Sequence, residues 1–144
     1  MLSEGLQSYL AANTPLQGLL GTPSTRADKS TGIWPIQAPD EVPDPWIVFQ
    51  QVSGQPLQES FQGTGRLRTS RWRFTCYGST YKRATKLAEA LVDAMISLDG
   101  TLAGASAEVH GSWLRLELDE KEALPKGTVF ASHRDFEINY YDLH

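Results

Sequence analysis

The sequence predicts a single α+β domain in which one β-sheet packs against helices, with the element order α-β-β-α-β-β. Three segments carry this prediction: an alternating strand at residues 70–76, an amphipathic helix over about 80–98, and a closing alternating strand at 135–140. Because each of these segments has an apolar side to bury, a sheet covered by helices is the simplest way to combine them.

The bulk composition fits one globular domain spanning residues 1–144. The chain is long enough to bury a sizeable core, with 40% hydrophobic and 21% charged residues. Its formal net charge of -4 disfavours a protein whose main task is to grip nucleic-acid phosphates. The single cysteine excludes an intrachain disulfide and fits a reducing compartment. No segment resembles a signal peptide or a membrane-spanning helix, so we expect a soluble protein that is intracellular when made.

The N-terminal third is predicted to contain a short helix followed by loops. Four apolar residues recur at helical spacing before Asn13: Leu2, Leu6, Tyr9 and Leu10. A further helical turn is expected to end at Gly21. Residues 22–32 are polar and predict a surface loop, whereas 33–36 predict a short extended segment. Prolines then exclude a helix and favour an edge or a linker: Pro39, Pro43 and Pro45.

Two strands are predicted in the middle of the chain. Residues 46–52 are mostly apolar, which is typical of a strand covered on both faces at its start. Residues 54–65 are polar and rich in glycine, and predict a long hairpin loop. The second strand places three residues on one face: Trp72, Phe74 and Cys76. The apolar phase changes near Thr69, so a bulge or a departure from the core is expected there.

The main helix is expected to begin at a Ser79 or Thr80 cap and to end at Asp99-Gly100. Its inner stripe is apolar: Ala84, Leu87, Ala88, Leu91, Met95 and Leu98. This spacing is far more common in core packing than in partner docking.

Two further strands are predicted after the helix. In the region 107–118, one face holds three leucines: Leu114, Leu116 and Leu118. A phase change predicts a bulge near Gly111-Ser112. The last strand presents three apolar residues on one side: Phe136, Ile138 and Tyr140.

No catalytic, cofactor or metal site is predicted. Cys76 could act as a nucleophile with His110 or His133 as its base, but its place beside Trp72 and Phe74 favours a small buried hydrophobe. The histidines lack the spacing of metal ligands. The acidic run after the leucine strand is interpreted as a solvated corner: Glu117, Asp119, Glu120 and Glu122.

One basic cluster has two interpretations, and its members are Arg66, Arg68, Arg71 and Arg73. It could contact DNA or an acidic partner. Cross-strand ion pairs of Arg71 and Arg73 with Asp135, Glu137 or Glu117 are the simpler interpretation, since these arginines point away from the apolar face.

Four segments taken in order resemble the tail completion (tail terminator) family of long-tailed bacteriophages, over nearly the full chain: PWIVFQQVSG, RWRFTCYG, STYKRATKLAEALVDAM and RDFEINYYD. The direct join of strand to helix is the most specific part. The resemblance implies a non-enzymatic virion protein that forms a ring, typically a hexamer, at the head-proximal end of the tail tube. The ring would stop tube polymerisation and offer a docking face to the head.

The resemblance also implies partners: other copies of the chain, the tail tube protein and a head connector or stopper protein. DNA would pass through the lumen without specific binding, and no cofactor or membrane is implied. The protein would reside in the host cytoplasm before assembly and in the virion tail afterwards. The alternatives are a head-side connector or stopper, and a small hydrolase using Cys76.

Interface residues are expected on the polar loop and the basic cluster: Gln58, Phe61, Arg66, Arg68, Arg71 and Arg73. The 54–65 loop is predicted to contact a neighbouring subunit or the tail tube, because long polar loops in compact domains are often functional.

Overall fold

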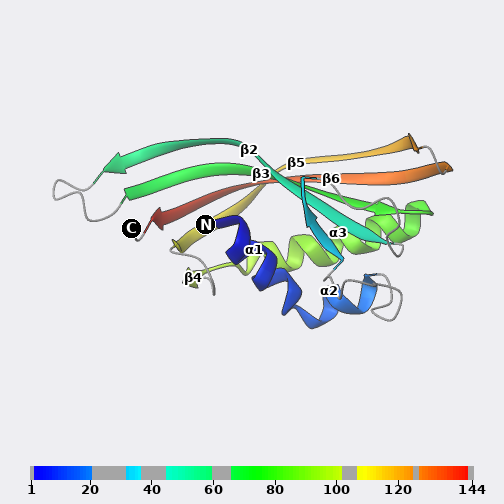
Figure 1. Cartoon of the computed structure of the whole chain (residues 1–144), viewed down its shortest axis with the longest axis horizontal. Helices are drawn as coiled ribbons and strands as arrows, with labels where there is room; N and C mark the ends of the chain where they lie inside the picture. The colour runs from blue at the N-terminus through cyan, green and yellow to red at the C-terminus, as the bar shows by residue number, and fades with distance from the viewer. Residues whose placement is uncertain are drawn as a thin grey trace.

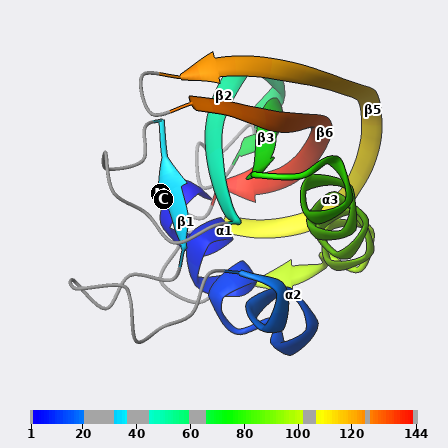
Figure 2. The same cartoon turned by 90° about the vertical axis from the view of Figure 1, so that its right-hand side faces the viewer.

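A curved six-stranded sheet with three helices on one side makes up the fold (Figures 1 and 2). The computed structural model describes residues 2–20, 32–36, 45–59, 66–101, 107–124 and 127–142. The elements in chain order are α1 (Leu2–Ala11), α2 (Thr14–Leu19), β1 (Ile33–Pro35), β2 (Trp46–Glu59), β3 (Arg66–Gly78), α3 (Tyr81–Ile96), β4 (Gly100–Thr101), β5 (Ala107–Leu124) and β6 (Gly127–Asp142).

The sheet has the strand order β1-β2-β3-β6-β5-β4. Its four long strands, β2, β3, β6 and β5, are antiparallel to their neighbours, whereas β1 runs parallel to β2 over three residue pairs. The prediction of one sheet packed against helices is confirmed in this coarse sense. The predicted element order is incomplete, because a second helix and the short strands β1 and β4 add to it.

The predicted hairpin loop at 54–65 is wrong for its first half. Residues 54–59 belong to β2 and pair with β3, and the remaining part, 60–65, lies outside the described residues. Two register shifts, between Gln51 and Ser53 and between Pro56 and Gln58, let this glycine- and proline-containing segment continue the ladder.

Of the two alternatives expected near Thr69, the bulge in β3 is wrong, whereas a departure of the strand from the core agrees with the structure (Figure 1). The strand pairs with β6 from Arg66 to Gly78 without any register shift, and the irregularities lie on the β2 side instead. The apolar phase is lost because the ends of β2 and β3 extend past the helices (Figure 1), where neither face of the sheet has to be apolar.

Two bulges interrupt β5. The register shift between Val109 and Gly111 confirms the predicted one, and a second lies between Leu114 and Leu116. This second shift means that the leucines do not share a face. Leu114 pairs with buried Phe136, whereas Leu116 pairs with Asp135 on the opposite side of the sheet. The alternation rule failed here because one extra residue reverses every later side chain.

The core lies between the helices and the concave side of the sheet. Thr80 caps α3 by accepting a hydrogen bond from the Arg83 amide at 3.2 Å, and the predicted inner stripe of α3 is buried. The sheet contributes three fully buried rings: Phe49, Phe74 and Phe136. Phe74 stacks on Phe49 at a centroid separation of 5.5 Å and meets Phe136 edge-on at 5.8 Å.

Helices α1 and α2 complete the core. Both contribute fully buried leucines: Leu6, Leu10 and Leu16. Asn13 separates the two helices and caps α2, its side chain accepting from the Leu16 amide at 2.9 Å. The second turn ends at Leu19, and the predicted end at Gly21 lies outside the described residues. The three helices of the described residues lie on one side of the sheet, and the opposite side, called the open face here, carries no described helix (Figure 1).

Candidate functional site on the open face of the sheet

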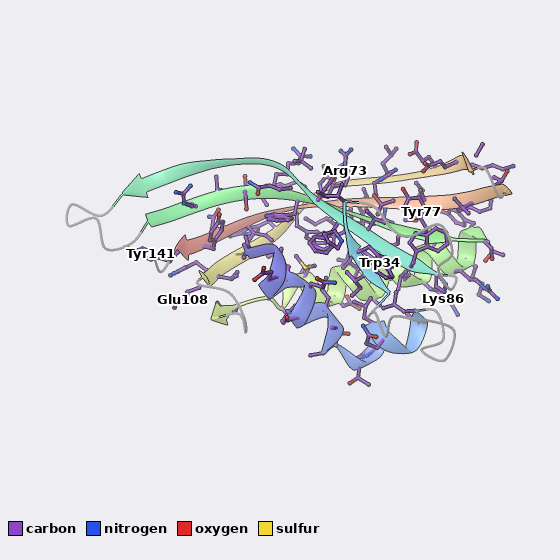
Figure 3. The ribbon with its side chains drawn as sticks, in the orientation of Figure 1. Trp34, Arg73, Tyr77, Lys86, Glu108 and Tyr141 are labelled. Carbon is purple, nitrogen blue, oxygen red and sulfur yellow. The ribbon has the colours of Figure 1, made fainter. Side chains whose placement is uncertain are left out.

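An arginine-carboxylate cluster occupies the middle of the open face. Asp135 on β6 accepts from Arg73 Nε at 2.8 Å, from a second Arg73 nitrogen at 3.1 Å and from Arg71 Nε at 3.2 Å. The Asp135 side chain is 1% exposed, while those of Arg71 and Arg73 are 40% and 35% exposed. Arg73 lies on the side of the sheet away from the helices (Figure 3). The predicted engagement of both arginines with an acidic neighbour is therefore confirmed.

The hydrogen bonds within this cluster change the pKa of Arg73. Hydrogen bonding to Asp135 raises the pKa of the Arg73 guanidinium above its ordinary value, although burial opposes this shift. Since Arg73 binds the carboxylate through two nitrogens, the pair is also geometrically fixed. The guanidinium groups of Arg71 and Arg73 are therefore already bound to the carboxylate of Asp135.

Two further polar contacts on this face follow the same pattern. Arg115 donates to Glu137 at 2.8 Å, and both side chains are substantially exposed. His133 lies 2.6 Å from Glu120 through Nε2 and 2.8 Å from the Thr75 hydroxyl through Nδ1. Among the described residues of the open face, Arg71, Arg73 and Arg115 each have a carboxylate partner, which suits contact with protein better than capture of phosphates.

Aromatic and aliphatic side chains surround these polar groups. Trp46 and Tyr77 stack with their ring centroids 5.2 Å apart and their planes at 16°. On β5, Trp113 and Leu118 are 44% and 49% exposed. Partly buried Trp46 and Tyr77 and exposed Trp113 thus lie on the same face as the paired arginines, and tryptophan, tyrosine and arginine are enriched at protein–protein interfaces.

The ring of Trp113 lies directly over Gly111. A Cβ atom at Gly111 would meet Trp113 ring carbons at 2.5, 2.9 and 3.1 Å, so only glycine permits this approach. In the sequence, Gly111 indicated only a bulge. A glycine two residues before a tryptophan, on the same face of a strand, is the signal that could have identified the contact.

The acidic run is largely solvent-exposed, as predicted, and part of it also forms ion pairs. Arg134, 8% exposed, donates to Asp119 at 2.9 Å and lies 3.6 Å from Glu117. Desolvation acts to raise the pKa of Asp119. Hydrogen bonds from Arg134, from Ser132 and from Tyr81 outweigh it, and this pKa lies below its usual value. This cluster is on the helix side of the sheet, and Tyr81 links it to the start of α3.

The remaining predicted interface residues are distributed over different places. Gln58 and Arg66 lie on the ladder between β2 and β3, and Phe61 lies outside the described residues. Arg68 pairs with Tyr140 in the phase of Trp72, on the helix side of the sheet. The predicted basic cluster is therefore divided between the two faces, because neighbouring strand positions alternate.

The predicted burial of Cys76 is confirmed, and this burial raises the pKa of its thiol far above the ordinary value. Neither histidine proposed as its base is seen to contact it: His133 binds Thr75 and Glu120, and His110 packs near Tyr141. His, Cys, Asp and Glu side chains form no group suited to a metal ion within the described ranges. No helix among the described residues is long and apolar enough to cross a membrane.

Comparisons with known proteins concern the family and the fold of the chain. The sequence model of the family described as tail completion protein gp17 matches residues 5–127. A search of curated proteins found no match. Among solved structures, the chain is similar to one in the virion of a native gene transfer agent (GTA) particle, with a TM-score of 0.63 and 16% identity over 96% of each chain. At 16% identity, this similarity is evidence of a shared fold only.

Proposed function

The chain belongs to the family of the tail completion protein gp17, and on this premise we propose that it caps the head-proximal end of a tail tube as a ring. Family membership identifies a structural tail protein. The proposal adds that the ring, most simply a hexamer, ends tube polymerisation and offers a docking face to a head connector or stopper protein. The match over residues 5–127 is the observation that carries this proposal.

The open face supports an assembly role. Its arginines already have carboxylate partners in Asp135 and Glu137, and exposed Trp113 offers an apolar anchor. A net charge of -4 per chain favours a lumen that does not hold DNA. A single domain over residues 1–144 is part of this proposal, as is its place in the cytoplasm before assembly and in the virion afterwards.

Adding the purified protein to headless tails tests the proposal. We expect negative-stain images to show a ring at one tube end and further tube growth at that end to stop. Tubes incubated without the protein serve as the control. Absence of the protein from tube ends, or tight salt-sensitive DNA binding by the monomer, would contradict the proposal. Co-purification with heads in the absence of tails would favour the connector or stopper alternative instead.

The hydrolase alternative is tested separately with a bulky thiol reagent. Because Cys76 is fully buried and its pKa is raised by burial, we expect labelling to require unfolding. Rapid stoichiometric labelling of the native protein would return this alternative to consideration. The same preparation provides the control, since denaturation should expose its one thiol.

A further inference from the structure

We propose that free copies of the chain associate in pairs through the outer side of α3, with the two helices lying antiparallel. This inference goes beyond the proposed function and does not depend on it, because it concerns the protein before it meets a tail. The surface consists of four exposed charged residues of α3, called the charged stripe here: Lys82, Lys86, Glu89 and Asp93.

The charged stripe runs in one line along α3. With about 100° of rotation per residue, its four side chains leave the helix within an arc of about 60°. This arc is opposite the buried side of the helix, at whose centre Leu91 lies. Ile96, 58% exposed, continues the same line beyond Asp93. Figure 2 shows α3 at the outside of the molecule, where a second copy can approach this line.

Interactions within the helix do not account for the order of these charges. The two lysines lie near the start of α3 and the two acids in its second half, the reverse of what the helix dipole favours. Like charges four positions apart repel on a helix, and the stripe has two such pairs, Lys82 with Lys86 and Glu89 with Asp93. Within the described part of the chain, the ion pairs found involve none of these four side chains.

The acidic run of β5 does not explain the two lysines either. Tyr81 brings Asp119 to the start of α3, at 3.2 Å from its hydroxyl group. However, Asp119 binds Arg134 at 2.9 Å, and Glu117 lies 3.6 Å from the same guanidinium group. These carboxylates therefore already have a cation of their own.

A second copy of α3 that runs in the opposite direction matches the charged stripe. Lys82 of one copy then faces Asp93 of the other, and Lys86 faces Glu89, because the two pairs share one midpoint along the helix. Both contacts recur across the two-fold axis, so every charge of the stripe meets an opposite charge. Two parallel helices in register would oppose like charges, and a parallel stagger of seven residues would match only half of the stripe.

The pairing is expected to be weak and sensitive to salt. Exposed ion pairs lie in water, which screens them, and added salt screens them further. We therefore expect a reversible monomer–dimer equilibrium with a Kd below about 1 mM at low salt, and dissociation of the dimer as salt is added. Such a dimer leaves single copies available for assembly.

Charge exchange on the stripe tests the pairing. Lys82→Glu with Lys86→Glu makes the stripe wholly acidic, and Glu89→Lys with Asp93→Lys makes it wholly basic. In sedimentation equilibrium, each variant alone should dimerise roughly tenfold more weakly than the unsubstituted chain. A mixture of the two should form a heterodimer, because all opposed charges are then of opposite sign. Combining all four substitutions reverses the stripe and should restore self-association.

Two controls accompany these variants. Asp99→Lys with Glu108→Lys makes the same change in net charge as the basic variant, but at exposed positions away from the stripe. It should bind the acidic variant no better than the unsubstituted chain does. Since the substituted side chains are all exposed, the thermal unfolding curves of the variants should agree closely with that of the unsubstituted chain.

Cysteine cross-linking determines the direction of the two helices. Lys82→Cys mixed with Asp93→Cys should give a disulfide-linked dimer on mild oxidation. Each variant alone should not, because equal positions of an antiparallel pair lie about 16 Å apart along the axis. The native thiol of Cys76 is buried, so the introduced cysteines alone report.

Three results would overturn the inference. The first is an unsubstituted chain that stays monomeric up to about 1 mM at low salt. The second is self-association of the acidic and basic variants as strong as that of the unsubstituted chain, which would place the contact elsewhere. The third is cross-linking of Lys82→Cys by itself, which would indicate parallel helices. Since none of these measurements uses tails, failure of the pairing and failure of the proposed function are separate results.

Discussion

Replacing Asp135 by asparagine is the sharpest test of how the open face is held together. The carboxylate is buried and accepts three hydrogen bonds from Arg71 and Arg73, at 2.8 to 3.2 Å. Asparagine preserves the shape but removes the charge. It also replaces one acceptor oxygen by an NH₂ group, which would face guanidinium donors. Two cations would then share a site without an anion.

The expected loss follows from the exposure of the partners. Removing one member of a fully buried ion pair costs about 3–5 kcal/mol. Here the arginine side chains are 40% and 35% exposed and can regain water, so we expect a loss of about 2–3 kcal/mol in the free energy of unfolding. For 144 residues, about 1 kcal/mol corresponds to roughly 3 °C, so Tm should fall by roughly 6–9 °C.

Glu137→Gln is the matched control. It removes a carboxylate from the same face and strand, but the Arg115–Glu137 pair is 51% and 37% exposed and should be worth only about 0.2–1 kcal/mol. Thermal and denaturant unfolding of both variants against the unsubstituted chain gives the comparison. If Asp135→Asn costs no more than Glu137→Gln, the reasoning from burial is refuted.

Three other substitutions test separate contacts of the fold. Gly111→Ala should displace the Trp113 ring, which lies too close for a Cβ, while stability changes by about 1 kcal/mol or less because the ring can move into solvent. One of the four tryptophan indole NMR signals should shift, and four unchanged signals would contradict the contact. Cys76→Ala should cost only about 1 kcal/mol in denaturant unfolding, since it removes one buried sulfur; a loss above about 3 kcal/mol would contradict a plain packing role. Asp119→Asn should cost about 1–2 kcal/mol at neutral pH by weakening the Arg134 contact. Because the folded pKa of Asp119 is lowered, its contribution is present above the unfolded value of about 3.9 and is lost as pH falls through the folded pKa. Unfolding measured against pH should therefore show the variant and the unsubstituted chain converging in acid, and a constant difference would refute this.

The local sequence pattern was sufficient to predict the helix and strands that have one buried side. The stripe of α3, with its Thr80 cap, and the buried face of β3 at Trp72 and Phe74 were both predicted, because 3.6-residue and two-residue periods reflect burial directly. The pairing of Arg71 and Arg73 with an acid followed from the same alternation, since Asp135 also points away from the apolar face.

Features that depend on a neighbouring strand could not be predicted from the sequence. The second β5 bulge, which separates Leu114 from Leu116, exists in relation to β6 and leaves no sign in composition. The polar residues 54–59 resemble a loop, yet they pair with β3 because the ladder extends past the helices. Local residue preference is weak there, and tertiary pairing decides.

The sequence by itself determined the helix with its cap, the alternating strands, the burial of Cys76 and, through the order of its segments, the family. Tertiary structure decided the strand order β1-β2-β3-β6-β5-β4, the unbroken register of β3 with β6, and the burial of Asp135 against Arg71 and Arg73. The physical reason is how far apart along the chain the interacting residues lie. Periodicity and capping arise from residues a few positions apart, whereas strand order, register and ion-pair choice arise from contacts between residues such as Arg71 and Asp135, 64 positions apart.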